Sequence, residues 1–112
     1  MENTKPFKRK ERVSELIRNE LSTLIMRELE LDAIMTIMRV EVTEKLTSAH
    51  VYVGILPSEK TKKVLDVLSK SAKFLERQLL RKINIKPMPE LIFHIDKGSL
   101  NAAEVERALL EK

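Results

Sequence analysis

The stretch VLSKSAKFLERQLLRK, residues 67–82, decides how the second half of the chain folds. Its apolar residues recur at steps of three and four, which is the spacing of a buried helix face. The residues on that face are Leu68, Ala72, Leu75 and Leu79. Small and cationic residues interrupt the pattern at positions 69–73. The stretch is therefore either one amphipathic helix or two helices that meet at a bend facing a polyanion.

The flanking segments predict the order of elements around this stretch. Apolar spacing of three and four indicates helices, period-2 alternation indicates strands, and Pro87 and Pro89 stop the central helices. The expected elements are a helix at 8–29, strands at 35–42 and 49–56 joined as an antiparallel hairpin by a loop at 43–48, a helix at 59–70 continued by the quoted stretch, a strand at 91–96 and a short helix at 102–111.

These elements predict the α+β class, with a three-stranded sheet covered by helices on one face. A chain of 112 residues is expected to form one domain. We divide it into a flexible basic tail at 1–7, a domain at 8–97 and a C-terminal helical extension at 98–112. The predicted core contains Val13, Leu16, Ile17, Leu21, Leu24, Val40, Val51, Val53, Leu68, Leu75, Leu79, Phe93 and Ile95. In the first strand, alternation predicts Met38, Val40 and Val42 on one face and Ile37, Arg39 and Glu41 on the other.

Composition indicates a cytoplasmic protein without a membrane segment. The chain has no cysteine, which excludes disulfides and fits a reducing compartment. Its basic N-terminus precedes no apolar run of signal-peptide type, and no stretch approaches the length of a transmembrane helix. We expect a cytoplasmic location and no contact with a membrane.

Positive charge is concentrated in two segments. Residues 60–86 contain 9 lysines and arginines against 2 acids, and residues 1–12 contain 5 against 2, although the whole chain carries only +4. Such asymmetry is typical of a surface that binds nucleic acid or another polyanion. The simpler interpretation is that lysines solvate helix faces.

Residue types that carry catalysis are scarce. His50 and His94 are the only histidines, and each lies at an outward position of a predicted strand. A phosphate-binding glycine loop, a nucleophile elbow and metal-ligand spacings are all missing from the sequence. We therefore predict no catalytic residues, no metal, no cofactor and no small-molecule substrate. A metal-dependent hydrolase that uses His50 and His94 remains an alternative, which failure to bind zinc or manganese would exclude.

Cationic side chains at helical spacing are the strongest binding feature. Lys70, Lys73, Arg77 and Arg81 form a row beside the apolar face, and we call this row the cationic stripe. Long cationic side chains on a rigid element suit phosphate recognition. With no Trp and one Tyr, recognition of the RNA backbone and shape is expected rather than base stacking. The candidate RNA-binding residues are Lys8, Arg9, Lys10, Arg12, Lys70, Ser71, Ala72, Lys73, Arg77, Arg81 and Lys82.

Three segments, together with a final predicted helix that ends in Leu109 and Leu110, resemble the bacterial ribosome-binding factor A family over about residues 7–110. They are RVSELIRNELSTLIMRE (12–28), TIMRVEVTEKLTSAHVYVGIL (36–56) and LSKSAKFLERQLLRKINIKPMPELIFHID (68–96). The resemblance implies a type II KH fold. KH domains hold RNA with a GxxG loop between two helices, and the resemblance implies a short Ala-x-Gly kink in its place. The matching positions here are 71–73, Ser-Ala-Lys, so this chain lacks the glycine and adds a charge. We predict two helices that meet at this kink.

The resemblance also implies a function. It implies a non-enzymatic, monomeric factor that binds the small ribosomal subunit and its rRNA. Such a factor assists late maturation, including processing of the rRNA 5′ end, and is associated with cold adaptation. From the residues alone, two other interpretations stay open: a general KH-like RNA-binding protein without a ribosomal role, and a protein-interaction adaptor. Preference for small subunits over unrelated structured RNA would exclude the first interpretation. Salt-insensitive binding to a protein partner would favour the second.

Overall fold

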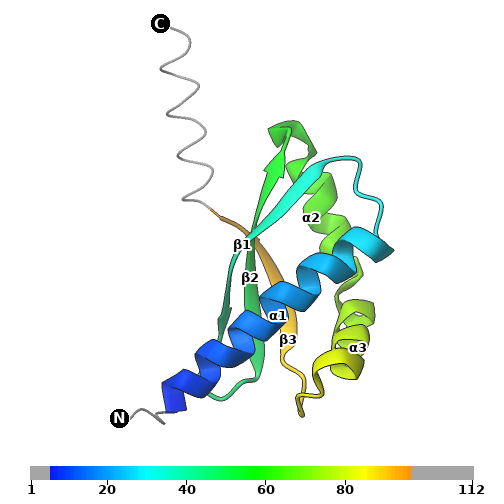
Figure 1. Ribbon diagram of the computed structural model, residues 1–112. Coiled ribbons are helices and arrows are strands. Elements are labelled where there is room, and N and C mark those ends of the chain that lie inside the picture. Colours follow the sequence, from blue (N-terminus) through cyan, green and yellow to red (C-terminus); the bar gives the residue numbers. More distant parts are fainter. Residues whose placement is uncertain (1–5, 97–112) are drawn as a thin grey trace, which may run out of the picture.

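A computed structural model describes residues 6–96 and contains the predicted order of elements (Figure 1). The elements are α1 (Pro6–Glu28), β1 (Ile34–Val42), β2 (Ser48–Leu56), the short 3-10 turn η1 (Ser58–Lys60), α2 (Thr61–Lys70), α3 (Ala72–Ile83) and β3 (Glu90–Ile95). The α+β class is confirmed. The predicted helix at 102–111 and residues 1–5 of the predicted tail lie outside the described residues. None of the described helices is long and apolar enough to cross a membrane.

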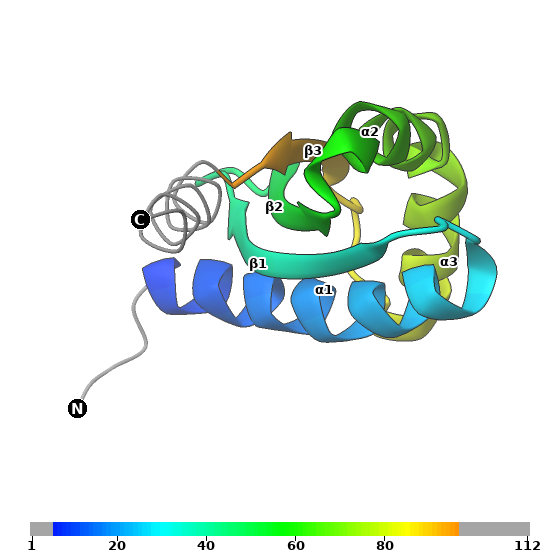
Figure 2. The same ribbon diagram turned by 90° about the horizontal axis from the view of Figure 1, so that it is seen from above.

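The three strands form one sheet in the order β1-β2-β3. β1 and β2 pair antiparallel, as a hairpin does, whereas β2 and β3 pair parallel. A parallel pair requires a long crossover connection, which α2 and α3 supply. In Figures 1 and 2, α1 runs along β1 while α2 and α3 lie beside β3. The opposite face of the sheet carries none of the described helices, and we call it the outer face.

One apolar cluster joins all three helices to the inner face of the sheet. α1 contributes a stripe at three- and four-residue steps, and β2 contributes every second residue from Ala49 to Ile55. This matches the two periodicities read from the sequence. Of the predicted core, the residues confirmed as buried are Val13, Ile17, Leu21, Leu24, Val40, Val51, Val53, Leu68, Leu75, Leu79 and Phe93.

Two predicted core positions are wrong. Leu16 is 40% exposed. It lies one residue away from Ile17, about 100° around the helix, and so outside the stripe that faces the sheet. Ile95 is only half-buried because it is the last residue of β3.

The predicted facing of β1 is also wrong at its centre. The pairing register shifts between Ile37, which pairs with Val53, and Arg39, which pairs with Tyr52. Met38 is therefore an extra residue in a β-bulge, and a bulge reverses the alternation on one side of itself. As a result Ile37 is 4% exposed and buried with Val40, whereas Met38 is 40% exposed.

Candidate nucleic-acid interface

The predicted break at 71–73 is confirmed, and it lies at Ser71. α2 ends at Lys70 and α3 begins at Ala72. The N–H of Ser71 donates to the carbonyls of Val67 (3.0 Å) and Leu68 (3.2 Å), which closes α2 with a bifurcated bond. The carbonyl of Ser71 accepts from the N–H of Leu75 at 2.9 Å and opens α3.

The break does not require a glycine. Ser71 has φ −90° and ψ 0°, in the bridge region that any residue can adopt. Among the described residues, the non-glycine positions with positive φ are Asp32, Leu46 and Asn84. The sequence Ser-Ala-Lys therefore forms the break without the left-handed conformation for which glycine is favoured. Ser71 and Ala72 are half-buried, and Ala72 packs against the core.

A larger side chain at Ala72 tests whether RNA approaches the break between α2 and α3. We expect Ala72→Leu to lower RNA affinity about tenfold while costing roughly 1–3 kcal/mol of stability through overpacking. RNA binding and urea unfolding measure the two effects separately. Ser69→Leu adds similar bulk on the exposed side of α2, two residues before the break, and serves as the control. Parallel loss of binding and stability for Ala72→Leu would identify Ala72 as a core residue only.

Three residues of the cationic stripe share one face of α3, and the fourth lies at the end of α2. Lys70 ends α2, and Lys73, Arg77 and Arg81 lie on one face of α3, all of them exposed. The eight steps from Lys73 to Arg81 span about 12 Å of helix. The opposite face of α3 is fixed by Leu75 and Leu79, which are both fully buried. The stripe is therefore held on a rigid element.

Ion pairs within the protein involve two of the stripe's four cations, Lys70 and Lys73. Lys70 Nζ lies 3.3 Å from Asp66 Oδ2, and both side chains are more than half exposed. Exposed pairs of this kind contribute only about 0–1 kcal/mol and exchange easily. Within residues 6–96, Arg77 and Arg81 have no ion-pair partner. Lys82, which is also exposed, lies beside Glu20 and Thr23 of α1 rather than on the stripe.

The candidate residues at the start of α1 lie apart from the stripe. Figures 1 and 2 both show the first turns of α1 at the far end of the molecule from α3. Arg9 and Arg12 are exposed, and the side chain of Lys8 lies outside the described residues. Two separate basic surfaces are therefore present instead of one.

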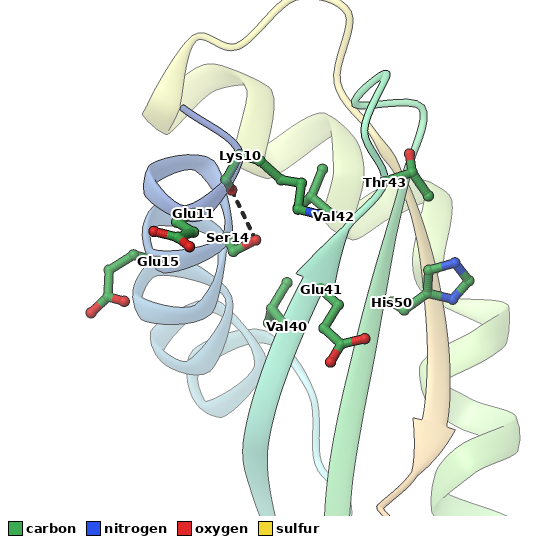
Figure 3. Close-up of a pocket in the computed structure, with 9 residues that line it drawn as sticks. All are labelled: Lys10, Glu11, Ser14, Glu15, Val40, Glu41, Val42, Thr43 and His50. Atoms are coloured by element: carbon green, nitrogen blue, oxygen red, sulfur yellow. Dashed lines mark hydrogen bonds between the residues drawn. The ribbon is translucent and has the colours of Figure 1, made fainter. Parts of the chain in front are cut away.

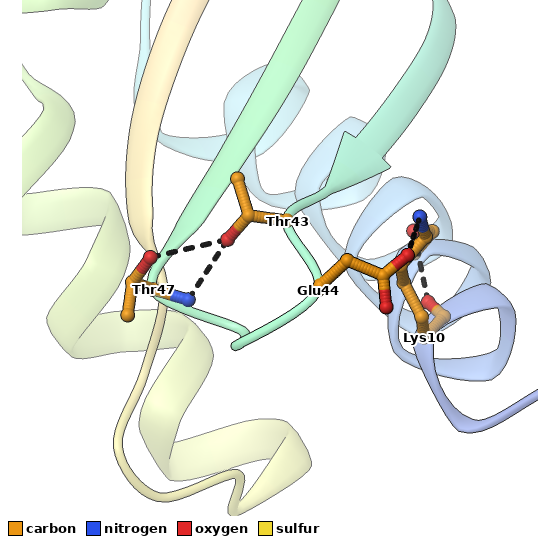
Figure 4. Close-up of polar contacts among 5 residues, drawn as sticks. Lys10, Thr43, Glu44 and Thr47 are labelled. Atoms are coloured by element: carbon orange, nitrogen blue, oxygen red, sulfur yellow. Dashed lines mark hydrogen bonds and ion pairs between the residues drawn. The ribbon is translucent and has the colours of Figure 1, made fainter. Parts of the chain in front are cut away.

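Lys10 is held by the loop that joins β1 and β2 (Figure 4). The hydroxyl oxygen of Thr43 accepts bonds from the N–H groups of Thr47 and Ser48, both at 3.1 Å. These bonds fold the loop, and Glu44 Oε2 lies 3.3 Å from Lys10 Nζ. Lys10 thus has an acidic partner within the protein, as Lys70 does, whereas Arg77 and Arg81 have none among the described residues.

A hollow of about 670 Å³ lies between α1 and the β1–β2 hairpin (Figure 3). The side chain of Ser14 on its α1 wall donates to the carbonyl of Lys10 at 3.0 Å. Carboxylates of Glu11, Glu15 and Glu41 line the hollow, against the single cation of Lys10. Because acids outnumber cations there, we do not assign this hollow to RNA phosphates.

A row of planar side chains crosses the outer face. The guanidinium carbon of Arg39 lies 3.9 Å from the ring centre of Tyr52, and the Tyr52 and His94 rings are 4.9 Å apart. His50 Nδ1 and His94 Nε2 are 2.8 Å apart and share a hydrogen bond. The alternation of apolar and polar residues along each strand predicted that these side chains point outward. It did not predict the row, because the row depends on the register that makes these residues cross-strand neighbours. The described residues contain no group of three or more His, Cys, Asp or Glu suited to a metal.

The histidine pair makes stability depend on pH. Burial, and then the nearby His50, lower the pKa of His94 from 6.5. A histidine whose pKa is lowered by folding is neutral in the native state, so stability is full above pH 6.5 and falls as the pH drops through the lowered pKa. We expect the urea midpoint to decrease over this window, and His94→Asn to flatten the decrease. Tyr52→Phe, which leaves both imidazoles in place, should keep the wild-type slope. The same slope in His94→Asn as in the wild type would contradict the assignment.

Comparisons with known proteins agree on one family. The protein-family model described as "Ribosome-binding factor A" matches residues 9–109. A ribosome-binding factor A of Hahella chejuensis is 37% identical over 115 residues, which cover 95% of this chain and 84% of the relative. The crystal structure of ribosome-binding factor A from Thermus thermophilus has a TM-score of 0.69 at 22% identity and covers 77% of this chain and 93% of its own. A homology model of the Thermus thermophilus factor, fitted into a cryo-EM map of a complex with the 30S subunit, has a TM-score of 0.63 at 21% identity and covers 74% of this chain and 90% of that one.

Proposed function

Because the chain belongs to the ribosome-binding factor A family, we propose that it binds the small ribosomal subunit and assists its late maturation. We include the processing of the 5′ end of small-subunit rRNA in this role, and we propose that the protein acts without catalysis. The Thermus thermophilus relative, fitted into a complex with the 30S subunit, supports the small subunit as the partner.

The cationic stripe carries the assignment of the RNA contact. Lys73, Arg77 and Arg81 project from one face of a helix whose other face is buried. Because the helix backbone is already ordered, binding costs conformational entropy only in the side chains of the row and not in the backbone that carries them. The break at Ser71 lies at the head of this row, where half-buried Ser71 and Ala72 present little bulk to an approaching backbone.

The expected mode is recognition of RNA backbone and shape. α3 carries one aromatic residue, Phe74, which is half-buried and packs against the core, so the stripe offers no exposed ring on which a base could stack. The planar row that includes Tyr52 and His94 lies on the outer face of the sheet, away from α3. Phosphate contacts position a protein on RNA without reading sequence. Selectivity for the small subunit would then come from the shape of its folded rRNA.

Loss of the protein in cells tests the maturation role. We expect cells that lack it to accumulate small-subunit rRNA with extra nucleotides at the 5′ end, which primer extension measures. The wild-type chain should restore the mature end, and a chain with Lys73, Arg77 and Arg81 changed to Glu should not. The 5′ end of large-subunit rRNA from the same cells is the internal control. Normal small-subunit ends in the deleted strain would contradict the role in processing.

A further inference from the structure

Glu76 is the single acidic residue of α3, and it lies at the edge of the cationic stripe, beside Lys73. Its side chain is 14% exposed, whereas that of neighbouring Lys73 is 75% exposed. A carboxylate this well covered, on an otherwise basic and solvated helix face, requires partners to offset its desolvation. The structure provides two, one for each oxygen.

One oxygen of Glu76 fastens α3 to the edge of β3. Oε2 accepts the backbone N–H of Leu91 at 2.9 Å. The N–H groups of Glu90 and Asp96 donate to carbonyls of Thr47 and Val53, on the β2 side. Since N–H groups alternate in direction along a strand, that of Leu91 points away from β2. Glu76 therefore satisfies an edge donor that the sheet leaves unpaired.

The other oxygen faces the stripe. Oε1 lies 3.8 Å from Lys73 Nζ, at the end of the row nearest the break. We propose that Glu76 is a positioning residue of the RNA interface, which fixes α3 on β3 through Leu91 and restrains Lys73 through its charge. The inference rests on the proposed function, because it assumes that the stripe contacts rRNA.

The two roles of Glu76 have opposite effects on binding. The bond to Leu91 holds α3, and with it the stripe, in a fixed position, which favours binding. The negative charge attracts Lys73 and repels phosphate, which opposes binding. Changing Glu76 to Gln removes the charge but keeps an oxygen that can accept from Leu91. Changing it to Ala removes both, so the two variants separate charge from fastening.

Purified small ribosomal subunits and the full-length chain provide the binding test. Glu76→Gln should bind about three- to fivefold more tightly than the wild type, which corresponds to a surface charge pair of up to about 1 kcal/mol. Its slope of log K against log salt should steepen by less than the roughly 0.7–0.9 of one full phosphate contact, because Lys73 already contacts phosphate in the wild type and Glu76 offsets only part of its charge. Glu76→Ala should bind more weakly than Glu76→Gln, although the two have the same charge. Glu41→Gln changes the net charge equally on the outer face and should bind like the wild type.

Hydrogen exchange of the Leu91 amide gives a readout that does not depend on RNA. The amide should exchange slowly in the wild type and in Glu76→Gln and markedly faster in Glu76→Ala. Equal affinity of Glu76→Gln and Glu41→Gln would overturn the electrostatic half of the inference, and unchanged exchange in Glu76→Ala would overturn the fastening half. If the wild type itself does not bind small subunits, the proposed function fails and the electrostatic half fails with it, whereas the exchange experiment still decides the fastening.

Discussion

Reversing the charge of Lys73, Arg77 and Arg81 together, each to Glu, should lower the affinity for small-subunit rRNA by about a hundredfold near physiological salt. Each phosphate contact contributes roughly 0.7–0.9 to the slope of log K against log salt, so removing three should reduce that slope by about 2–3. The three side chains are exposed and lie off the buried face of α3, so stability should change by less than about 1 kcal/mol per residue. Filter binding over a salt series, with urea unfolding of the same preparations, measures both quantities.

A matched charge reversal separates a local contact from a change of net charge. Arg18, Arg39 and Lys45 are exposed and lie on α1, on the outer face of β1 and in the β1–β2 loop, away from α3. Changing these three to Glu alters the net charge by the same amount and should leave the salt slope close to that of the wild type. Equal losses in the two triple variants would mean that the stripe acts only through overall charge. An unchanged slope in the stripe variant would move the RNA contact to the start of α1.

Phe93→Ala should have the largest effect on folding, a loss of about 3–5 kcal/mol of unfolding free energy. Phe93 is 7% exposed, lies in β3 beside Val51 of β2 and belongs to the cluster that joins the sheet to α2 and α3. Truncation would leave a cavity at this junction. A loss of this size is a large part of the stability of a small domain, so the urea midpoint should fall steeply.

The neighbouring residue on the same strand provides the control for Phe93. Ile92 points to the outer face and is only half-buried, so Ile92→Ala should cost about 1 kcal/mol or less. Comparable losses for the two variants would show that β3 is not held by its inner face. That result would contradict the arrangement of the sheet described above.

The sequence predicted the order of elements because each buried face repeats with a regular period. Ile17 and Leu21 on α1, and Val51 and Val53 on β2, follow those periods and are buried. The prediction for β1 was wrong because pairing with a second strand changed the period. The bulge at Met38 depends on the register between β1 and β2, which a single strand does not encode.

The candidate site was predicted to the extent that it lies on one element. Spacing of four residues placed Lys73, Arg77 and Arg81 on one helix face, and the structure keeps them there. The distance of this row from the start of α1 depends on how the helices pack, which local spacing does not determine. The contact of Glu76 with Leu91 joins residues fifteen positions apart, and the sequence shows it only as one acid among cations.

Co-sedimentation with purified small and large ribosomal subunits, over a series of salt concentrations, tests whether the chain binds the small subunit through phosphate contacts. The wild-type chain should pellet with small subunits at low salt and be released as salt rises, with a slope that the stripe variant reduces. With large subunits it should stay in the supernatant. Equal pelleting with both subunits would indicate a general RNA-binding protein that has no preference for the small subunit. Pelleting with small subunits that salt does not weaken would contradict an interface built on phosphate contacts.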